Sequence, residues 1–433
     1  MTNVNLSRIL FFNPDIQPVS RRETLTRVCE IGTLICLIAL AAAMPFADIT
    51  AAREIALYLG LFFWAARMIL AGKWDMVRTP LDLPLALFAA AALISLITAV
   101  DPAYTFDQIK GELLPHILIL YLAVNNLRTE SRAVLVFTGL LIGALVMDGY
   151  GIVYFLNHAQ SLTDQSARLI SLHEGAPQLW TYLLQTVPYI MMGVLWFKNR
   201  PVRALFIAFL ALHTLTLYMT FGRMALIVFI LQVGLILILL GVRMKWIGAL
   251  CLIGVTVLIV FLPRQYFVFG EEAKNVAHIG PIGIYGEAGA RPLAWGLALR
   301  YIADHPFSGL GYGRRSFNIK YPEPAQTNPN MWHVHNVFIR MAVSAGIQGL
   351  AAFCFLVFRV FKFLWPGRSR PPAWLSGGIA GPVIAGTFIM VFGFIINNLT
   401  NDLYADDSAL MFWLLVGLAF SLKIFSPKRH QER

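Results

Sequence analysis

The chain has 433 residues, of which 58% are hydrophobic and only 13% are charged, and its formal net charge is +11. A mean hydropathy of +0.68 excludes a soluble protein whose whole surface faces water. The basic residues fall between apolar runs instead of forming one face, which argues against a nucleic-acid partner. We therefore expect an all-α polytopic membrane protein in contact with membrane lipids.

About twelve apolar runs can each cross a bilayer core about 30 Å thick, which takes about 20 helical residues. The runs lie near residues 28–46, 52–70, 81–99, 113–126, 134–156, 178–197, 204–220, 224–241, 246–262, 334–358, 376–399 and 408–424. The polar segment before the first run has no small-residue cleavage site, so we expect no signal-peptide removal. We expect membrane-core positions for the four cysteines, which are Cys29, Cys36, Cys251 and Cys354.

The connections between runs alternate in charge. Every second connection is basic, with residues such as Lys73, Arg128, Lys198, Arg243 and Arg359. The short connections on the other side are acidic instead, with Asp48, Asp101, Asp107, Asp402, Asp406 and Asp407. By the positive-inside rule, we expect both termini in the cytoplasm and the acidic connections outside, with Asp406 and Asp407 as solvated residues that enforce the topology.

One long outside connection divides the chain into three parts. Residues 1–262 hold about nine spans, residues 263–333 form the loop, and residues 334–433 hold about three more spans. A loop of this length is more often a functional lid than a passive linker. The spacing of apolar residues predicts a short amphipathic helix over 291–304 at the membrane surface, ended by His305 and Pro306.

Three side chains on the outside edge could carry chemistry. Arg223 lies at the tight turn between two spans, Arg291 opens the amphipathic stretch, and His335 stands where the loop re-enters the membrane. A snorkelling arginine, a solvated loop charge and a histidine of the interfacial belt are the plain alternatives. Together, the three suit transfer of a sugar from a lipid diphosphate. Arginine forks match phosphate oxygens, and a histidine can accept a hydroxyl proton near neutral pH.

Two other kinds of chemistry have little support. The sequence has no nucleotide-binding loop. His305, His333 and His335 are close in sequence, but their spacing gives no shared ligand face and no acidic cluster accompanies them, so we expect neither a metal nor a cofactor. Asp402, at the outside end of an apolar run, is a lesser candidate for substrate binding.

One signature points to a known family. His335 and Asn336, followed after nine residues by Gly346-Ile347-Gln348-Gly349, closely resemble the H-[NSQ]-x9-G-x-x-G signature of bacterial O-antigen ligases. Arg223 with its aliphatic run looks like the family's arginine before the long loop. The segments from Arg291 to Trp295 and from Asp304 to Gly313 are similar to the loop core shared with related polymerases. The resemblance covers about residues 205–425 by motif.

The resemblance implies a metal-independent and ATP-independent glycosyltransferase. It would move O-antigen from undecaprenyl diphosphate to the lipid A-core oligosaccharide at the periplasmic face of the Gram-negative inner membrane. Arg223 and Arg291 would bind the diphosphate and His335 would be the essential histidine. Arg168 and Asn336 would be further substrate-binding positions. Direct displacement of the diphosphate would invert the anomeric carbon.

Three alternatives remain open. An O-antigen polymerase would use the same donor with a second lipid-linked glycan as acceptor. A protein-glycosylating relative would share the signature but often carries a soluble C-terminal domain, whereas this sequence ends soon after its last apolar run. A transporter of lipid-linked glycan would place its site near the membrane midplane, where the candidates are Asp148, His213 and Pro188.

Overall fold

The computed structural model describes residues 20–46, 49–161, 169, 176–243, 246, 254, 284–327, 329–367 and 372–425. Within these ranges, every regular element is a helix. Seven of the described helices are long and apolar enough to cross a membrane. The expected class of all-α polytopic membrane protein is therefore confirmed.

The helices of the first half follow the predicted runs closely. They are α2 (Arg21–Ala43), α3 (Thr50–Ala71), α4 (Asp82–Ile94), α5 (Pro102–Gln108), η2 (Ile109–Leu113), α6 (Leu114–Asn126), α7 (Glu130–His158), α8 (Ala176–Trp196), α9 (Arg200–Met219) and α10 (Arg223–Leu239). The run predicted at 246–262 lies almost wholly outside the described residues. So do Cys251 and the expected boundary between residues 262 and 263.

The second half contains the loop helices and three long helices. These elements are α13 (Ile284–Asp304), α14 (Arg315–Lys320), α15 (Glu323–Thr327), η6 (Pro329–Met331), α16 (Val337–Leu364), η7 (Ala373–Leu375), α17 (Ala380–Asn397) and α18 (Asp406–Phe425). The amphipathic helix expected over 291–304 is present, although α13 begins earlier, at Ile284. It ends as predicted, because His305 N–H makes the last helical bond, to Tyr301 O at 2.8 Å.

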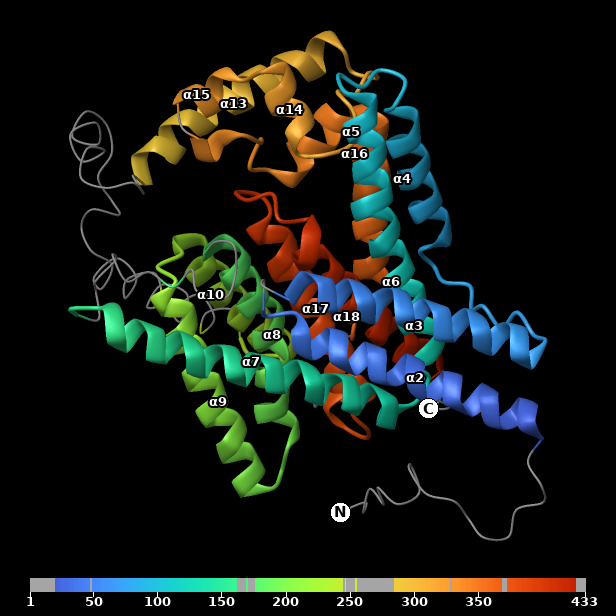
Figure 1. The fold of residues 1–433 in the computed structure, drawn as a ribbon. Helices are drawn as coiled ribbons and strands as arrows, with labels where there is room; N and C mark the ends of the chain where they lie inside the picture. Colours follow the sequence, from blue (N-terminus) through green and yellow to red (C-terminus); the bar gives the residue numbers. More distant parts are fainter. Residues whose placement is uncertain are drawn as a thin grey trace.

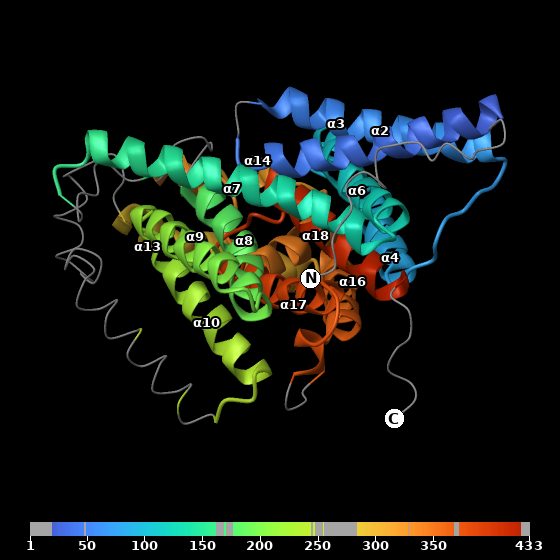
Figure 2. The same ribbon diagram turned by 90° about the horizontal axis from the view of Figure 1, so that it is seen from below.

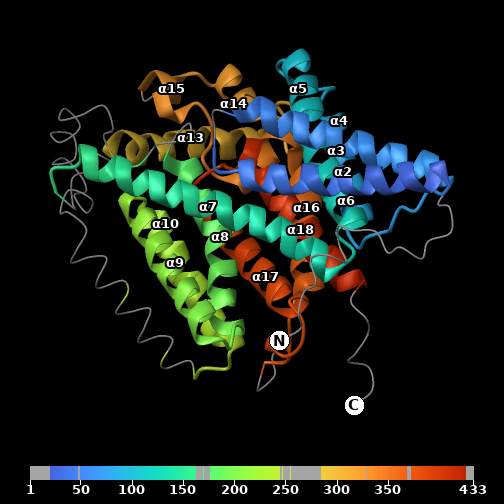
Figure 3. The ribbon, with the colours of Figure 1, turned by 60° about the horizontal axis from the view of Figure 1, so that its bottom comes forward.

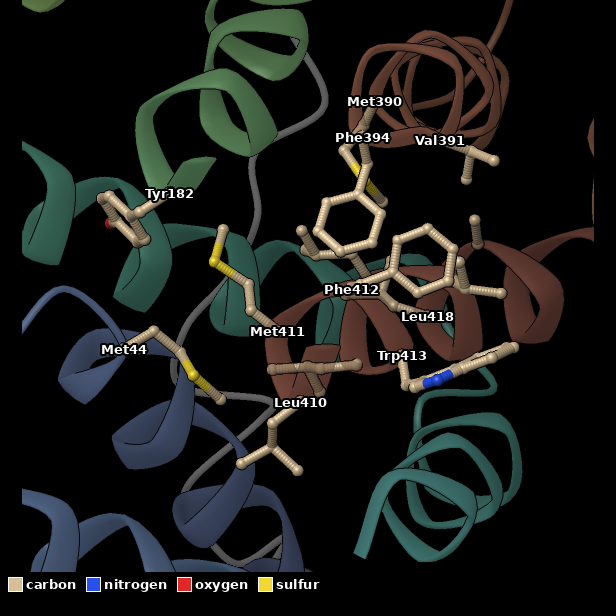
Figure 4. Packing of buried hydrophobic residues seen from close by; sticks show 14 of the residues in the cluster. Met44, Tyr182, Met390, Val391, Phe394, Leu410, Met411, Phe412, Trp413 and Leu418 are labelled. Atoms are coloured by element: carbon tan, nitrogen blue, oxygen red, sulfur yellow. The ribbon is translucent and has the colours of Figure 1, made fainter. Parts of the chain in front are cut away.

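The helices are arranged around α17 and α18. Figure 1 shows these two at the centre, with α4, α5, α6 and α16 standing together on one side and α13 to α15 forming a layer above. Helices α2, α3 and α7 run across the molecule, as Figures 2 and 3 also show. In the most apolar 18-residue segment of α17 and of α18, 78% is buried inside the protein, against 22% in the corresponding segment of α9. Aromatic rings such as Phe394 and Phe412, 4.7 Å apart, fill this core (Figure 4).

The two ends of the helices differ in their polar contacts. At one end, Arg128 pairs with Asp75, and Lys423 donates to Phe363 O at 2.6 Å. At the other end, three short connections converge near residues 98–105, 306–315 and 398–408. This second end carries the outside connections expected from the sequence, and we call it the loop end.

A break in α16 anchors the loop to the helices. Gly346 has φ 72° and ψ 179°, a conformation that only glycine adopts readily. The break leaves Val343 O and Ser344 O to accept bonds from Leu310 N–H at 2.8 Å and Gly311 N–H at 3.0 Å. The signature glycine therefore opens α16 so that the glycine-rich segment after α13 can dock onto it.

Candidate active site

His335 lies in the short connection that leads into α16. Its φ is 53°, which is unusual for a residue other than glycine and stores strain of about 1–2 kcal/mol. The His335 ring stacks on that of His333, with ring centroids 3.8 Å apart. The backbone N–H of His335 donates to His333 Nδ1 at 3.2 Å. The His335 side chain is partly exposed while His333 is buried. The connection therefore presents His335 at the surface from a fixed backbone.

The neighbouring Asn336 caps α16. Its Oδ1 accepts from Phe338 N–H at 2.9 Å and Ile339 N–H at 3.1 Å, which satisfies two donors of the first helical turn. Its Nδ2 donates to Leu399 O at 2.9 Å and so ties α16 to the connection before α18. These contacts give Asn336 a structural role, and its expected part in substrate binding stays a prediction.

Asp402 is fully buried beside an arginine of α16. Arg340 Nε lies 2.8 Å from Asp402 Oδ1, and Arg340 Nη2 donates to Tyr404 O at 2.8 Å. The carboxylate contact is aligned too poorly for a hydrogen bond, so it acts as an ion pair. Burial favours the neutral acid, but the charge of Arg340 outweighs it and lowers the pKa of Asp402. The carboxylate is therefore held as an anion under the histidine pair.

His333 is the neutral member of this cluster. Burial lowers the pKa of its imidazole, although Asp402 acts in the opposite direction. Its Nδ1 lies 3.6 Å from Asp402 Oδ2, too far for a hydrogen bond, whereas the same atom accepts the amide of His335. These contacts favour the tautomer with its proton on Nε2. An uncharged ring therefore supports His335.

Arg314 brings a second cation to the same end. It is paired with Asp406, and its guanidinium lies 5.3 Å from the ring centre of Trp332. Burial opposes its charge, but Asp406 and Glu112 overcome this and raise the pKa of Arg314. Asp406 is exposed and Asp407 partly exposed, as expected of solvated residues, but both are also paired with arginines. Both begin α18, and Asp407 is paired with the buried Arg53, because apolar surroundings leave these arginines no water to solvate them.

Two of the predicted arginines lie on the described helices α13 and α10. Arg291 is half-buried on α13, one turn before Trp295, whose Nε1 donates to Val334 O at 2.8 Å. Arg291 therefore shares a helix face with the contact to the His335 connection. Arg168 lies outside the described residues.

Arg223 is half-buried at the first position of α10. The preceding Gly222 lies against the Trp180 ring of α8, and the next residue along α8, Thr181, accepts a bond from Asn397 Nδ2 at 2.8 Å. Arg223 is thus at the loop end, connected through α8 and α17 rather than through α13. Among the predicted residues, His335 is linked to Asp402 through His333, and Asn336 follows His335 directly in the chain.

The sequence interpretation missed Arg340 and Arg314. Arg340 carried a usable signal, because an arginine inside an apolar run must find a partner in the helix bundle. Arg314 directly follows the glycine-rich segment, in a loop with several other basic residues. Its pairing with Asp406 depends on how α18 begins, which no local pattern indicated.

The fold and the site together define a polytopic helical membrane protein with a histidine and buried arginines at one end of its helices. Residues 206–354 match the family model described as O-antigen ligase. This match confirms the resemblance to the O-antigen ligase/polymerase superfamily, whose members are glycosyltransferase-like enzymes with lipid-linked polysaccharide substrates. The matched segment contains Arg223, Arg291, His335 and Gly346. The search of curated proteins gave no match.

Proposed function

We propose that the protein is an O-antigen ligase that transfers polysaccharide from undecaprenyl diphosphate to the lipid A-core oligosaccharide. The observation that carries the proposal is His335, which a left-handed backbone and the neutral ring of His333 hold at the loop end, near the buried Arg340 and the partly buried Arg314. A fixed base next to fixed cations suits attack by a hydroxyl on a sugar diphosphate.

In this mechanism, the acceptor hydroxyl oxygen attacks the anomeric carbon of the donor sugar. The new glycosidic bond forms as the bond from that carbon to the diphosphate oxygen breaks, with inversion. His335 takes the hydroxyl proton, and undecaprenyl diphosphate leaves with the electron pair. Arg291 and Arg223 hold the diphosphate and stabilise its growing charge. The donor supplies the free energy, so neither ATP nor a metal is required.

The proposal includes a location and an orientation. The site faces the periplasm from the inner membrane, and both termini lie in the cytoplasm. Support comes from the charge pattern, since the end opposite the site gathers Arg128, on the connection between α6 and α7, with Arg359 and Lys423 near the ends of α16 and α18. Arg168, outside the described residues, and Asp402 are retained as proposed substrate-binding positions.

The transporter alternative is less well supported. Its midplane candidates Asp148 and His213 are both fully buried and bind each other, with His213 Nδ1 2.7 Å from Asp148 Oδ2. His213 Nε2 also lies 2.6 Å from Thr186 Oγ1. These contacts tie α7, α8 and α9 together, which is a structural use of intramembrane polar groups.

The proposal is tested by incubating purified protein with polyprenyl-diphosphate-linked glycan and lipid A-core. The reaction contains a chelator and no nucleotide, and the glycan-bearing products are measured. Transfer of glycan to the core supports a ligase. Lengthening of the polyprenyl-linked glycan alone would replace the ligase with a polymerase. No product in either assay, from folded protein, would contradict an enzyme and favour transport.

A further inference from the structure

Arg67 is a buried cation at the basic end of the helices, opposite the loop end. It lies one turn before the end of α3. Its ion-pair partner is Glu30, whose Oε1 is 4.0 Å from Arg67 Nη1, too far for a hydrogen bond. The Arg67 guanidinium makes no hydrogen bond to any residue that the structure describes. A guanidinium so placed in an apolar helix is costly unless a ligand or water completes its bonds.

The carboxylate beside Arg67 is already bound by another arginine. Glu30 Oε2 accepts from Arg132 Nη2 at 2.9 Å, and Arg128 is paired with Asp75. The charged groups that act on Arg67 are Glu30, Asp75, Arg128 and Arg132, and we call the five residues together the Arg67 cluster. Within the described parts of the chain, three arginines therefore face two carboxylates, and one positive charge stays unbalanced.

The Arg67 cluster is accessible to an anion. The side chain of Arg67 is 11% exposed and that of Arg132 is 30% exposed. The nitrogens of Arg67 are not fully enclosed, in contrast to Nε and Nη1 of Arg340. Helix α2 packs against both α3 and α7 (Figure 3), so three helices bring these charges together. An anion can therefore reach Arg67 and Arg132 from outside the protein.

The surroundings of the cluster favour a lipid phosphate. Trp74, which follows α3, is 79% exposed, as is typical of an aromatic residue at the level of the lipid headgroups. Arginine forks match phosphate oxygens in pairs. Acyl chains can lie on exposed apolar side chains of the same three helices, within one turn of these charges, which are Val28, Ile31, Ile69 and Val134.

We propose that the Arg67 cluster binds the phosphate of an anionic phospholipid in the membrane leaflet at the basic end. Arg67 donates to the phosphate oxygens, and Arg132 adds its charge while it remains bound to Glu30. The negative charge of the lipid balances the positive charge that the two carboxylates leave over. This site lies at the end opposite His335, so its lipid is distinct from the glycan donor.

The test measures binding to the delipidated full-length protein in a neutral detergent. The probes are phosphatidylglycerol, which is anionic, phosphatidylcholine, which is zwitterionic, and inorganic phosphate. The parent is expected to bind phosphatidylglycerol at least about tenfold more tightly than phosphatidylcholine, the range of charged hydrogen bonds. Arg67→Gln is expected to lose most of this preference. Arg67→Lys, which keeps the charge without the planar fork, should retain part of it.

Arg203→Gln is the matched control, because it removes one positive charge from an exposed arginine in the first turn of α9, outside the Arg67 cluster. It should keep the parent's preference, and thermal unfolding without lipid checks that each variant is folded. Equal binding of both lipids by the parent would overturn the proposal. An equal loss in Arg67→Gln and Arg203→Gln would overturn it too, since general surface charge would then explain the binding. Inorganic phosphate bound through Arg67, without any lipid preference, would replace the lipid with a soluble phosphate compound.

Discussion

The residues around His335 are a buried ion pair and an uncharged imidazole ring. The ion pair of Arg340 with Asp402 fixes two charges in a place without water, and His333 stays uncharged above them. His335 itself was identified from its signature. Its partners were not, because the contacts that join Arg340 and His333 to it run through Asp402, far along the chain, which was only a lesser candidate, and His333 was considered only as a metal ligand. Contacts across the fold, and no local pattern, define this part of the site.

The Arg340–Asp402 pair predicts strong coupling in stability. Arg340→Met leaves a buried carboxylate without its cation, which we expect to lower the free energy of unfolding by about 3–5 kcal/mol. Arg340→Met combined with Asp402→Asn should recover most of that loss. Chemical denaturation of the two single variants and the double variant measures the coupling. Additive losses would show that the pair is not energetically linked.

His333 predicts a pH dependence of stability. Its pKa is lowered in the folded protein from an ordinary value of 6.5, so the unfolded chain binds the proton first as the pH falls. Stability contributed by neutral His333 is thus present above about pH 6.5 and lost below it. Thermal unfolding between pH 7.5 and 5.5 should show a weaker fall in Tm for His333→Gln than for the parent. The exposed His158→Gln serves as the control, and equal slopes in all three would refute the assignment.

At the scale of elements, hydropathy predicted the described spans well because lipid demands long apolar helices. It could not predict where a span is interrupted. Hydrophobicity continues through the α16 break at Gly346, since the break is set by backbone geometry and by bonds from residues 306–311. Likewise, α13 extends beyond its apolar pattern to Ile284.

The α16 break predicts that Gly346→Ala is destabilising. A Cβ at this positive φ is strained and would lie 2.5 Å from the Gln348 side chain, so we expect a loss of about 1–3 kcal/mol and looser docking of residues 306–311. Gly296→Ala on α13 is the matched control, because its Cβ would meet open space, and it should be neutral or slightly stabilising. Denaturation and amide exchange of both variants provide the comparison. Equal behaviour of the two would show that the break is not required.

For the whole molecule, the loop end and the basic end predict a fixed orientation. In a cysteine-free background, Asp107→Cys should react with a membrane-impermeant maleimide added to intact cells, and Lys198→Cys should react only after lysis. Both positions are exposed, so access from water is equal apart from the membrane. Labelling of Lys198→Cys alone in intact cells would reverse the orientation and move the proposed site to the cytoplasm.

The proposed catalytic role of His335 is tested most directly by glycan transfer from undecaprenyl-diphosphate-linked glycan to lipid A-core, without nucleotide and with a chelator. We expect His335→Ala to lower turnover by at least about 100-fold with an unchanged Tm, because a general base contributes about 10²–10⁴-fold. His305→Ala, which removes an exposed loop histidine stacked on Tyr301, should retain the parent rate. Folded His335→Ala protein that transfers glycan as fast as the parent would contradict the mechanism.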